Sequence, residues 1–277
     1  MFRFLTRYRY LRSTYLYAFV GGASETRFKE RLGDLFHEGY LDRPAQQWDY
    51  ANARCKPVVH ELGAGAARIL RDYGADGART CCLERAAHRQ FRHSLLICEA
   101  LASIELGARA CGLRFIPWPE MLARAPEATR ATTRPFALPM PSGGYVVPDG
   151  AFGIEYRSGD ASAYRFFALE ADRGTMPLAR TRQGQTSYTA KLAAYQDAIG
   201  GRAHKAHWGV PNLLVLTLTT SESRLAAMLA RTDKDRSSPA FLFKAAEESA
   251  LVRPMPELFT APWERIGAPP LHIAESR

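Results

Sequence analysis

The chain has 277 residues, a net charge of +9 and 47% hydrophobic residues, which is typical of a globular protein and excludes a disordered or fibrous chain. No apolar run reaches the roughly 18 to 20 residues of a membrane span, and four arginines interrupt the N-terminal apolar stretch, so we expect neither a membrane anchor nor an export signal. The five cysteines show neither disulfide nor zinc spacing. We therefore expect a cytoplasmic protein with free thiols, and the basic balance is compatible with a polyanionic partner.

The first 70 residues predict a small helical unit followed by a β-hairpin. Residues 4–20 are apolar at helical spacing and predict one helix. Ser24 begins a second helix as a simple N-cap, and Gly39 ends it. Residues 40–62 alternate loosely between apolar and polar, which indicates two short strands joined by a loop, and another helix follows them.

This order of elements is that of a winged helix, in which the second helix is the recognition helix. We therefore assign residues 1–70 to a winged-helix DNA-binding domain with double-stranded DNA as its partner. The alternative is a helical oligomerisation cap whose charges only form a solvated face. Six basic residues on the second helix and in the wing are the candidate DNA contacts: Arg27, Lys29, Arg31, Arg43, Arg54 and Lys56.

Residues 71–87 are rich in glycine, alanine and charge, and they predict a linker. A long helix is expected over residues 88–112. Residues 114–143 contain six prolines, so we expect mostly loop there, with one short strand. The Pro-rich residues 251–270 are expected to wrap the surface.

The second half predicts a mixed sheet with flanking helices, so the whole chain is expected to be α/β (α+β). Two strands form a hairpin, and a continuous apolar run further on is typical of a strand buried on both faces. The expected order is strands 144–156 and 162–174, helix 185–201, strand 210–220, helix 222–233 and strand 239–248.

Four carboxylates fall in segments that otherwise look like core. Glu170 and Asp172 are two apart on one strand and project from the same face. Asp149 follows an apolar run and a proline, and Glu99 lies on the apolar face of the long helix. A buried carboxylate is costly unless it is paired or bound to metal. If the helix packs on the hairpin, Asp149, Glu170 and Asp172 converge with Glu99 assisting, and they hold Mg²⁺ or Mn²⁺ for phosphodiester hydrolysis.

Lys191 completes this candidate catalytic set. It lies on the helix after the hairpin, where it would orient the attacking water or stabilise the transition state. Structural interpretations stay open beside this one. Asp149 is a common turn residue, Glu99 and Lys191 are typical of exposed helix faces, and Glu170 and Asp172 have arginines nearby for an ion-pair network, namely Arg165, Arg173 and Arg180.

Three short segments together resemble the replication-relaxation family of plasmid and mobile-element proteins: Pro148-Asp149, Leu169-Glu170-x-Asp172-Arg173-Gly174-Thr175 and Lys191-Leu192-x-x-Tyr195. The stretch from His93 to Glu99 is similar to the family more loosely, and the order of motifs matches from about residue 5 to residue 220. The resemblance implies a winged helix joined to a domain similar to the PD-(D/E)xK nuclease fold, here residues 88–277. It also implies a role in plasmid-type replication initiation and in relaxation of supercoiled DNA.

One position departs from the PD-(D/E)xK pattern, because Asp172 stands where a lysine usually follows the strand glutamate. Either Lys191 supplies the amine from the helix, or the site is degenerate. The first hypothesis is a metal-dependent endonuclease or nickase. The second is a catalytically inactive fold that serves as a DNA-binding regulator or accessory factor, and the third is a protein–protein adaptor. Further candidate partners are a second copy of the chain and replication or mobilisation proteins.

Overall fold

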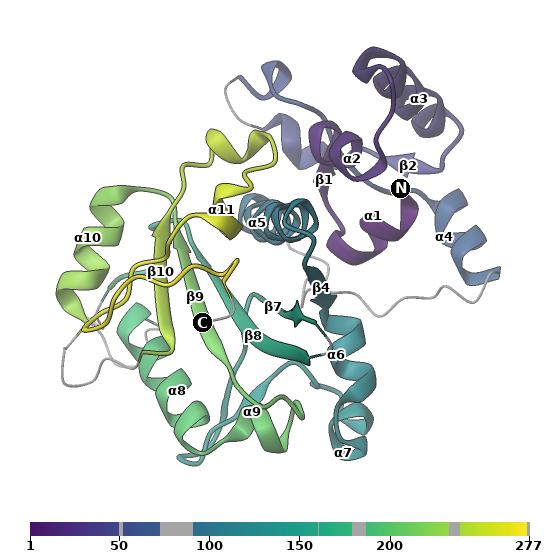
Figure 1. Ribbon diagram of the computed structural model, residues 1–277. Coiled ribbons are helices and arrows are strands. Elements are labelled where there is room, and N and C mark those ends of the chain that lie inside the picture. The colour runs from purple at the N-terminus through teal and green to yellow at the C-terminus, as the bar shows by residue number, and fades with distance from the viewer. Residues whose placement is uncertain (50–51, 73–90, 160, 179–186, 233–238, 276–277) are drawn as a thin grey trace. The chain divides into compact units, whose positions relative to one another are not determined.

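A computed structural model of the protein describes residues 1–49, 52–72, 91–159, 161–178, 187–232 and 239–275 (Figure 1). The chain forms two compact units, Met1–Gly107 with Glu248–Leu258 and Ala108–Glu247 with Phe259–Arg277. It is mixed α and β, as expected. The boundary between the units falls inside a long helix, whereas the sequence pattern begins the second domain at residue 88. Most of the predicted linker lies outside the described residues.

The first unit combines short helices with a three-stranded sheet in the order β1-β3-β2. Both strand pairs of this sheet are antiparallel. Along the chain its elements are α1 (Phe2–Tyr8), β1 (Leu11–Arg12), α2 (Ser13–Val20), α3 (Glu25–His37), β2 (Leu41–Asp42), the 3-10 turns Ala45–Trp48 and Ala53–Cys55, β3 (Val59–Leu62), α4 (Ala64–Asp72) and the long α5 (Phe91–Ala110).

The prediction of a single helix over residues 4–20 is wrong. Arg9 takes a positive φ of 63° and ends α1, because a residue in this conformation cannot continue a right-handed helix. Leu11 and Arg12 then pair with His60 and Val59 of β3. Both α1 and α2 bury one side, so the helical spacing of apolar residues continues through residues 9–12. The sequence pattern therefore gave no sign of the strand β1 between the two helices.

The second helix and the hairpin are confirmed. The Ser24 side chain accepts a hydrogen bond from the Arg27 N–H at 3.3 Å and caps α3. Gly39 closes α3 with a φ of 74°, a conformation that favours glycine. β2 then pairs with β3, with Leu41 opposite Leu62. The backbone at Gly63 approaches that at Gly39 so closely that a Cβ on Gly63 would lie 2.3 Å from the carbonyl oxygen of Gly39.

The second unit is built on a five-stranded sheet in the order β10-β9-β8-β7-β4. The predicted hairpin and the two later strands are confirmed, with β8, β9 and β10 parallel and β4, β7 and β8 antiparallel. Its elements are β4 (Arg114–Pro117), α6 (Trp118–Arg124), α7 (Glu127–Ala131), β5 (Leu138–Pro139), β6 (Tyr145–Val146), β7 (Gly150–Ser158), β8 (Ala161–Asp172), α8 (Tyr188–Gly200), α9 (Ala203–Ala206), β9 (Leu214–Thr219), α10 (Glu222–Arg231) and β10 (Phe241–Ala245).

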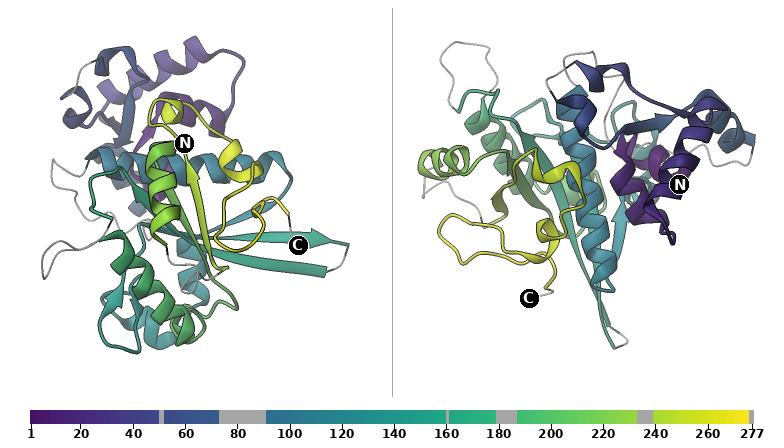
Figure 2. Two further views of the ribbon diagram at one scale, coloured as in Figure 1. Left: turned by 90° about the vertical axis from the view of Figure 1, so that its left-hand side faces the viewer. Right: turned by 90° about the horizontal axis from the view of Figure 1, so that it is seen from above.

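The strands β7 and β8 are longer than their neighbours and extend past them as a two-stranded ribbon (Figure 2). β9 pairs with β8 only from Phe167 onward. The C-terminal half of β8 therefore lies inside the sheet, flanked by β7 and β9. Phe167 to Ala171 are all buried, so side chains on both faces of this part of the strand are enclosed, Glu170 among them.

Two predictions about proline-rich segments are wrong. The short strand expected in residues 114–143 is confirmed as β4, but the rest is not mostly loop. It contains α6 and α7, because Pro117 and Pro126 stand at the N-caps of these helices, where a proline disrupts no helical hydrogen bond. The C-terminal segment does not simply wrap the surface. Phe259 and Trp263 are fully buried, so apolar anchors between the prolines enter the core.

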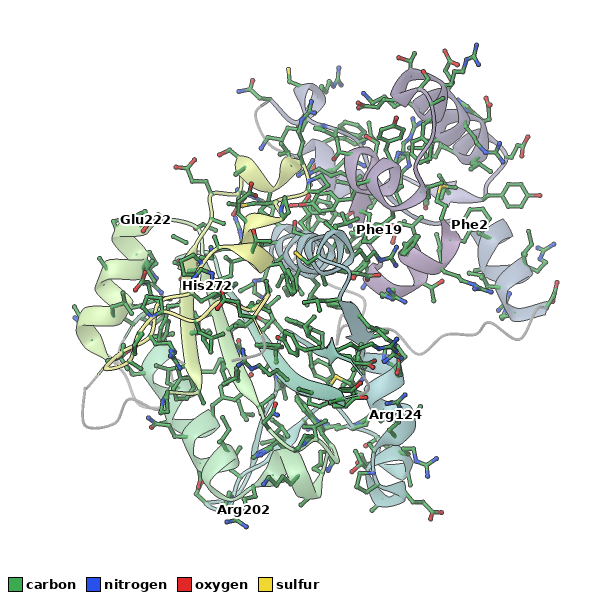
Figure 3. All side chains as sticks on the ribbon, in the orientation of Figure 1. Phe2, Phe19, Arg124, Arg202, Glu222 and His272 are labelled. Atoms are coloured by element: carbon green, nitrogen blue, oxygen red, sulfur yellow. The ribbon has the colours of Figure 1, made fainter. Side chains whose placement is uncertain are left out.

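The core of the second unit lies between one face of the sheet and the helix α8. Leu192 and Tyr195 of α8 pack in one cluster with Ala168 of β8 and Val215 of β9. Charged side chains such as Arg124 and Arg202 lie at the outside of this unit (Figure 3). The same face of β8 continues from Ala168 to Glu170, so the sheet carries a carboxylate directly toward the helix. No helix in the described part of the chain is both long and apolar enough to cross a membrane.

Candidate active site

Asp149 lies directly before β7 and is fixed against β8 by two hydrogen bonds. Its N–H donates to the carbonyl oxygen of Leu169 at 3.0 Å. One of its carboxylate oxygens accepts the N–H of Ala171 at 2.9 Å. These bonds bracket Glu170, which lies between the two partners in sequence. The hairpin therefore sets the carboxylate of Asp149 beside that of Glu170.

Lys191 and Tyr195 reach the same place from α8. Ser187 caps this helix, accepting the N–H of Ala190 at 3.3 Å. Lys191 and Tyr195 are four residues apart and share one face of the helix. The Lys191 ammonium forms an ion pair with one oxygen of Glu170, and the Tyr195 hydroxyl donates to the other. The same ammonium lies 4.0 Å from the carboxylate of Asp149.

This cluster is enclosed but not sealed. Glu170 is 8% exposed, whereas the side chain of Lys191 is 24% exposed. The two strands and the helix thus bring two carboxylates and one ammonium to a single point that solvent reaches from the lysine side. Three of the five residues predicted as catalytic meet here: Asp149, Glu170 and Lys191.

Burial and neighbouring charge shift the titration of these groups. Burial and the nearby Asp149 raise the pKa of Glu170 to about 8, against the opposing effect of Lys191. Burial lowers the pKa of Lys191, but Glu170 and Asp149 together raise it by more, so the pKa of Lys191 lies above its ordinary value. Burial and Glu170 raise the pKa of Tyr195 well above its ordinary value. Lys191 is consequently a stable cation at neutral pH.

Asp172 has a different partner. Its two carboxylate oxygens accept hydrogen bonds from the Arg224 guanidinium at 2.8 and 3.2 Å. The hydroxyl of Thr219, directly across in β9, adds a contact at 3.3 Å. A carboxylate held by a guanidinium at both oxygens is neutralised in place. The structure therefore brings Asp149 and Glu170 together and gives Asp172 its own ion pair.

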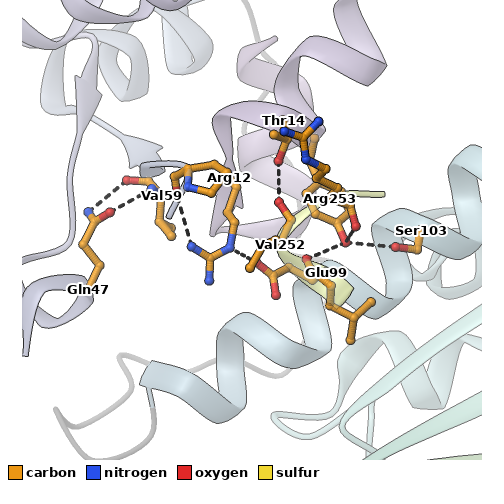
Figure 4. Close-up of polar contacts among 11 residues, drawn as sticks. Arg12, Thr14, Gln47, Val59, Glu99, Ser103, Val252 and Arg253 are labelled. Atoms are coloured by element: carbon orange, nitrogen blue, oxygen red, sulfur yellow. Dashed lines mark hydrogen bonds and ion pairs between the residues drawn. The ribbon is translucent and has the colours of Figure 1, made fainter. Parts of the chain in front are cut away.

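Glu99 belongs to the first unit, where it is paired with Arg12 (Figure 4). The Arg12 Nε lies 2.6 Å from the carboxylate of Glu99, and another guanidinium nitrogen donates to the carbonyl oxygen of Pro57 at 3.0 Å. Glu99 is 3% exposed, which confirms that it lies on a buried helix face. Burial raises its pKa to about 8, with Arg12 acting in the opposite direction. Its predicted assisting role stays a prediction.

The predicted three-carboxylate metal set is not gathered into one group. Among the residues that the structure describes, no three His, Cys, Asp or Glu side chains are placed to hold a metal ion together. The structure instead shows two carboxylates with a lysine and a tyrosine. Tyr195 and Arg224 were missed as polar partners. Tyr195 had a signal, because it lies four residues after Lys191, whereas Arg224 lies 52 residues after Asp172 and had none.

The six predicted DNA contacts all belong to the first unit and differ in their surroundings. Arg27, Arg31 and Arg54 are exposed. Lys29 is exposed as well and forms an ion pair with Glu25 at 2.8 Å. The remaining two, on the segment between β2 and β3, are partly buried: Arg43 and Lys56.

A family model described as replication-relaxation matches residues 2–214 of the chain. No curated protein matches the chain, and neither does any solved structure. The match spans both units and includes the positions of Asp149, Glu170 and Lys191. Because it covers well over half of the sequence, the chain belongs to the replication-relaxation family.

Proposed function

We propose that the protein binds double-stranded DNA of a plasmid or mobile element and cleaves or nicks it with a divalent metal ion. Family membership supports the setting of replication and relaxation. The observation that carries the chemistry is the meeting of Asp149, Glu170 and Lys191 at one point of the second unit. Paired carboxylates with a lysine are the parts of a PD-(D/E)xK-like site, here with the lysine on the helix.

The donor set fits Mg²⁺ or Mn²⁺. Mg²⁺ is usually bound by one or two carboxylates together with waters and substrate phosphates. Asp149 and Glu170 supply that pair, and the Lys191 ammonium already lies against both, so the two carboxylates accept a cation between them. When bound, such an ion would polarise a phosphate and lower the pKa of a coordinated water.

The side chains of the chain have distinct tasks in this proposal. The Ala171 N–H holds Asp149, and the Tyr195 hydroxyl holds Glu170, so both carboxylates are positioned before substrate arrives. Lys191 stays protonated because its pKa is raised, so it acts as a hydrogen-bond donor and not as a base. Its ammonium would stabilise negative charge on the phosphate as water bonds to phosphorus and the sugar oxygen leaves with a proton.

The first unit is proposed as the DNA-binding part. Three short helices followed by a hairpin, with the strand order β1-β3-β2, support a winged helix. In that fold α3 would enter the major groove. The exposed Arg27 and Arg31 on α3 and Arg54 in the wing are then placed to contact phosphates. A second copy of the chain and replication or mobilisation proteins are further proposed partners.

A second candidate function is DNA binding without cleavage, as a regulator or accessory factor. One observation favours it: Asp172 stands in place of the usual lysine and is neutralised by Arg224. The site then has two carboxylates that share one cation, Lys191, which offsets part of their charge. In this case the cluster would only stabilise the sheet against α8. The adaptor hypothesis differs from both, because it predicts no affinity for DNA.

A supercoiled-plasmid assay with Mg²⁺ or Mn²⁺ against EDTA separates these functions when it is run beside a gel shift at low and high salt. We expect metal-dependent nicking that Asp149→Ala abolishes, with unchanged DNA binding. A salt-sensitive shift without nicking would establish the binding-only function, since phosphate contacts release counterions. Absence of both results would favour the adaptor.

A further inference from the structure

The first unit contains a pocket of about 510 Å³ that the proposed chemistry does not use. It lies between α3 and the segment from β2 to β3, and residues 252 and 253 complete it. Its volume falls in the range of about 300 to 1,000 Å³ that is typical of small-molecule sites. All of its lining residues belong to the first unit, so the pocket is independent of the Asp149 and Glu170 cluster.

The lining is strongly basic. Four cations contribute to it, and among the described residues that line it none is an aspartate or glutamate. Glu25, just outside the lining, forms an ion pair with Lys29 at 2.8 Å and compensates part of this charge. The net excess still favours an anion, and an anion with two negative charges more than one with a single charge. The four cations are Lys29, Arg43, Lys56 and Arg253.

Two buried polar atoms of the lining have no hydrogen-bond partner among the residues that the structure describes. They are the Nε of Arg43 and the Nδ1 of His60. His60 is only 2% exposed, and buried polar atoms in folded proteins nearly always have a partner. Burial and the nearby Arg43 lower the pKa of His60 to about 4, so its ring is neutral and one nitrogen is free to donate. A ligand oxygen in the pocket would satisfy both atoms.

The rest of the lining is apolar. Leu32 of α3, Val58 before β3 and Val252 face the same space. The Arg43 guanidinium also stacks on the Phe36 ring, 4.1 Å from its centre, which fixes its plane. A bare inorganic anion would leave the apolar part of the pocket unfilled. A ligand with a phosphate at one end and a less polar body matches both parts.

We propose that this pocket binds a small phosphorylated ligand of mononucleotide size, with its phosphate against Arg43 and His60. Guanidinium groups suit phosphate because their N–H donors match its oxygens in pairs. The proposal goes beyond the proposed function and divides the six predicted DNA contacts. Lys29, Arg43 and Lys56 line the pocket, whereas the other three lie outside it.

The phosphate has two conceivable sources, a free mononucleotide or the backbone of bound DNA, and calorimetry on the full chain in EDTA separates them. The probes are inorganic phosphate, dAMP and dTMP. We expect saturable binding of a mononucleotide that weakens about tenfold in Arg43→Gln and in Arg253→Gln. Arg253 is exposed, so its variant guards against misfolding. Arg54→Gln, outside the pocket, is the matched control and should bind as the wild type does.

A gel shift with duplex DNA then identifies the source. If the free nucleotide is the ligand, Arg43→Gln keeps its affinity for DNA and Arg54→Gln loses part of it. If the backbone supplies the phosphate, Arg43→Gln loses DNA affinity and excess mononucleotide displaces DNA. The proposal is overturned if no probe binds and Arg43→Gln leaves DNA affinity unchanged, or if all three variants bind the probes equally. Because EDTA is present throughout, failure of the nuclease proposal would not affect these results.

Discussion

Two glutamates, Glu99 in the first unit and Glu170 in the second, are buried to a similar extent, at 3% and 8% exposure. Burial raises the pKa of each to about 8. Their neighbours differ. Glu99 forms its ion pair with Arg12, whose guanidinium is itself 8% exposed and also bound to backbone, while Lys56 acts on it more weakly. Glu170 meets a lysine that is partly exposed and shared with Asp149. A buried carboxylate is thus no site by itself; Glu170 differs because one partly exposed cation, Lys191, lies against it and against a second carboxylate at once.

The largest expected effect concerns the buried ion pair of Arg12 and Glu99 in the first unit. At pH 9, where Glu99 is ionised, Arg12→Met leaves its buried carboxylate without this cation, and we expect the free energy of unfolding to fall by about 3 to 5 kcal/mol. Removing both charges, in Arg12→Met with Glu99→Leu, should recover much of the loss. Urea denaturation of the full chain measures both effects. Equal stability of the single and the double variant would show that the ion pair does not hold this unit together.

The next effect concerns the partly exposed ion pair of Lys191 and Glu170 in the second unit. Lys191→Met should lower the nicking rate about 100-fold or more, because it removes a donor that stabilises transition-state charge. Arg224→Met removes the partner of Asp172 on the same strand and is the matched control. It should cost about 1 to 3 kcal/mol of stability while nicking persists at a temperature where the variant is folded. The same loss of nicking in both variants would show that the Lys191–Glu170 pair has no special role compared with the Arg224–Asp172 pair.

A smaller effect appears in the pH dependence of stability. Because the pKa of Glu99 is raised from 4.5 to about 8 in the folded chain, the folded state holds a proton that the unfolded state loses. The stabilisation is complete below pH 4.5 and is lost as pH rises toward 8. The wild type should therefore lose stability between pH 5 and 8 more steeply than Glu99→Gln, and a pKa difference of one corresponds to about 1.4 kcal/mol. Parallel curves would contradict this.

The smallest effect concerns the exposed cations of the first unit. Arg27→Gln and Arg31→Gln should each weaken DNA binding modestly and reduce the slope of log affinity against log salt by about 1. Glu170→Gln should leave that slope unchanged, because it removes no cation. Gel shifts at several salt concentrations measure this. A slope that is unchanged in both Arg27→Gln and Arg31→Gln would argue against α3 as the DNA-contacting helix.

Local patterns predicted most of the second unit. Alternation and turn residues gave the hairpin, and the apolar run gave β9, because burial on both faces leaves a clear mark on the sequence. Asp149, Glu170 and Lys191 were named because they fall in or beside apolar segments and match the family's motifs. The short β1 strand was missed, since two residues paired with a distant strand carry no local pattern of their own.

The polar partners of the other carboxylates were not predictable in the same way. Arg12 lies 87 residues before Glu99, and Arg224 lies 52 residues after Asp172. Which arginine reaches which carboxylate depends on the tertiary fold, and nearer arginines made equally good candidates. The helices α6 and α7 were missed for another reason. Proline ends a helix when it follows one but begins a helix at the first positions, and the sequence alone left that choice open.

The most direct test compares the two buried glutamates in one assay. Glu170→Gln and Glu99→Gln each replace an ionisable carboxyl group by an amide and keep the size of the side chain. Both variants and the wild type are incubated with supercoiled plasmid and Mg²⁺ or Mn²⁺, after circular dichroism has confirmed that they are folded. We predict that Glu170→Gln loses nicking and Glu99→Gln retains it. Nicking by Glu170→Gln at the wild-type rate, or none by the wild type itself, would contradict the assignment of the Asp149, Glu170 and Lys191 cluster as an active site.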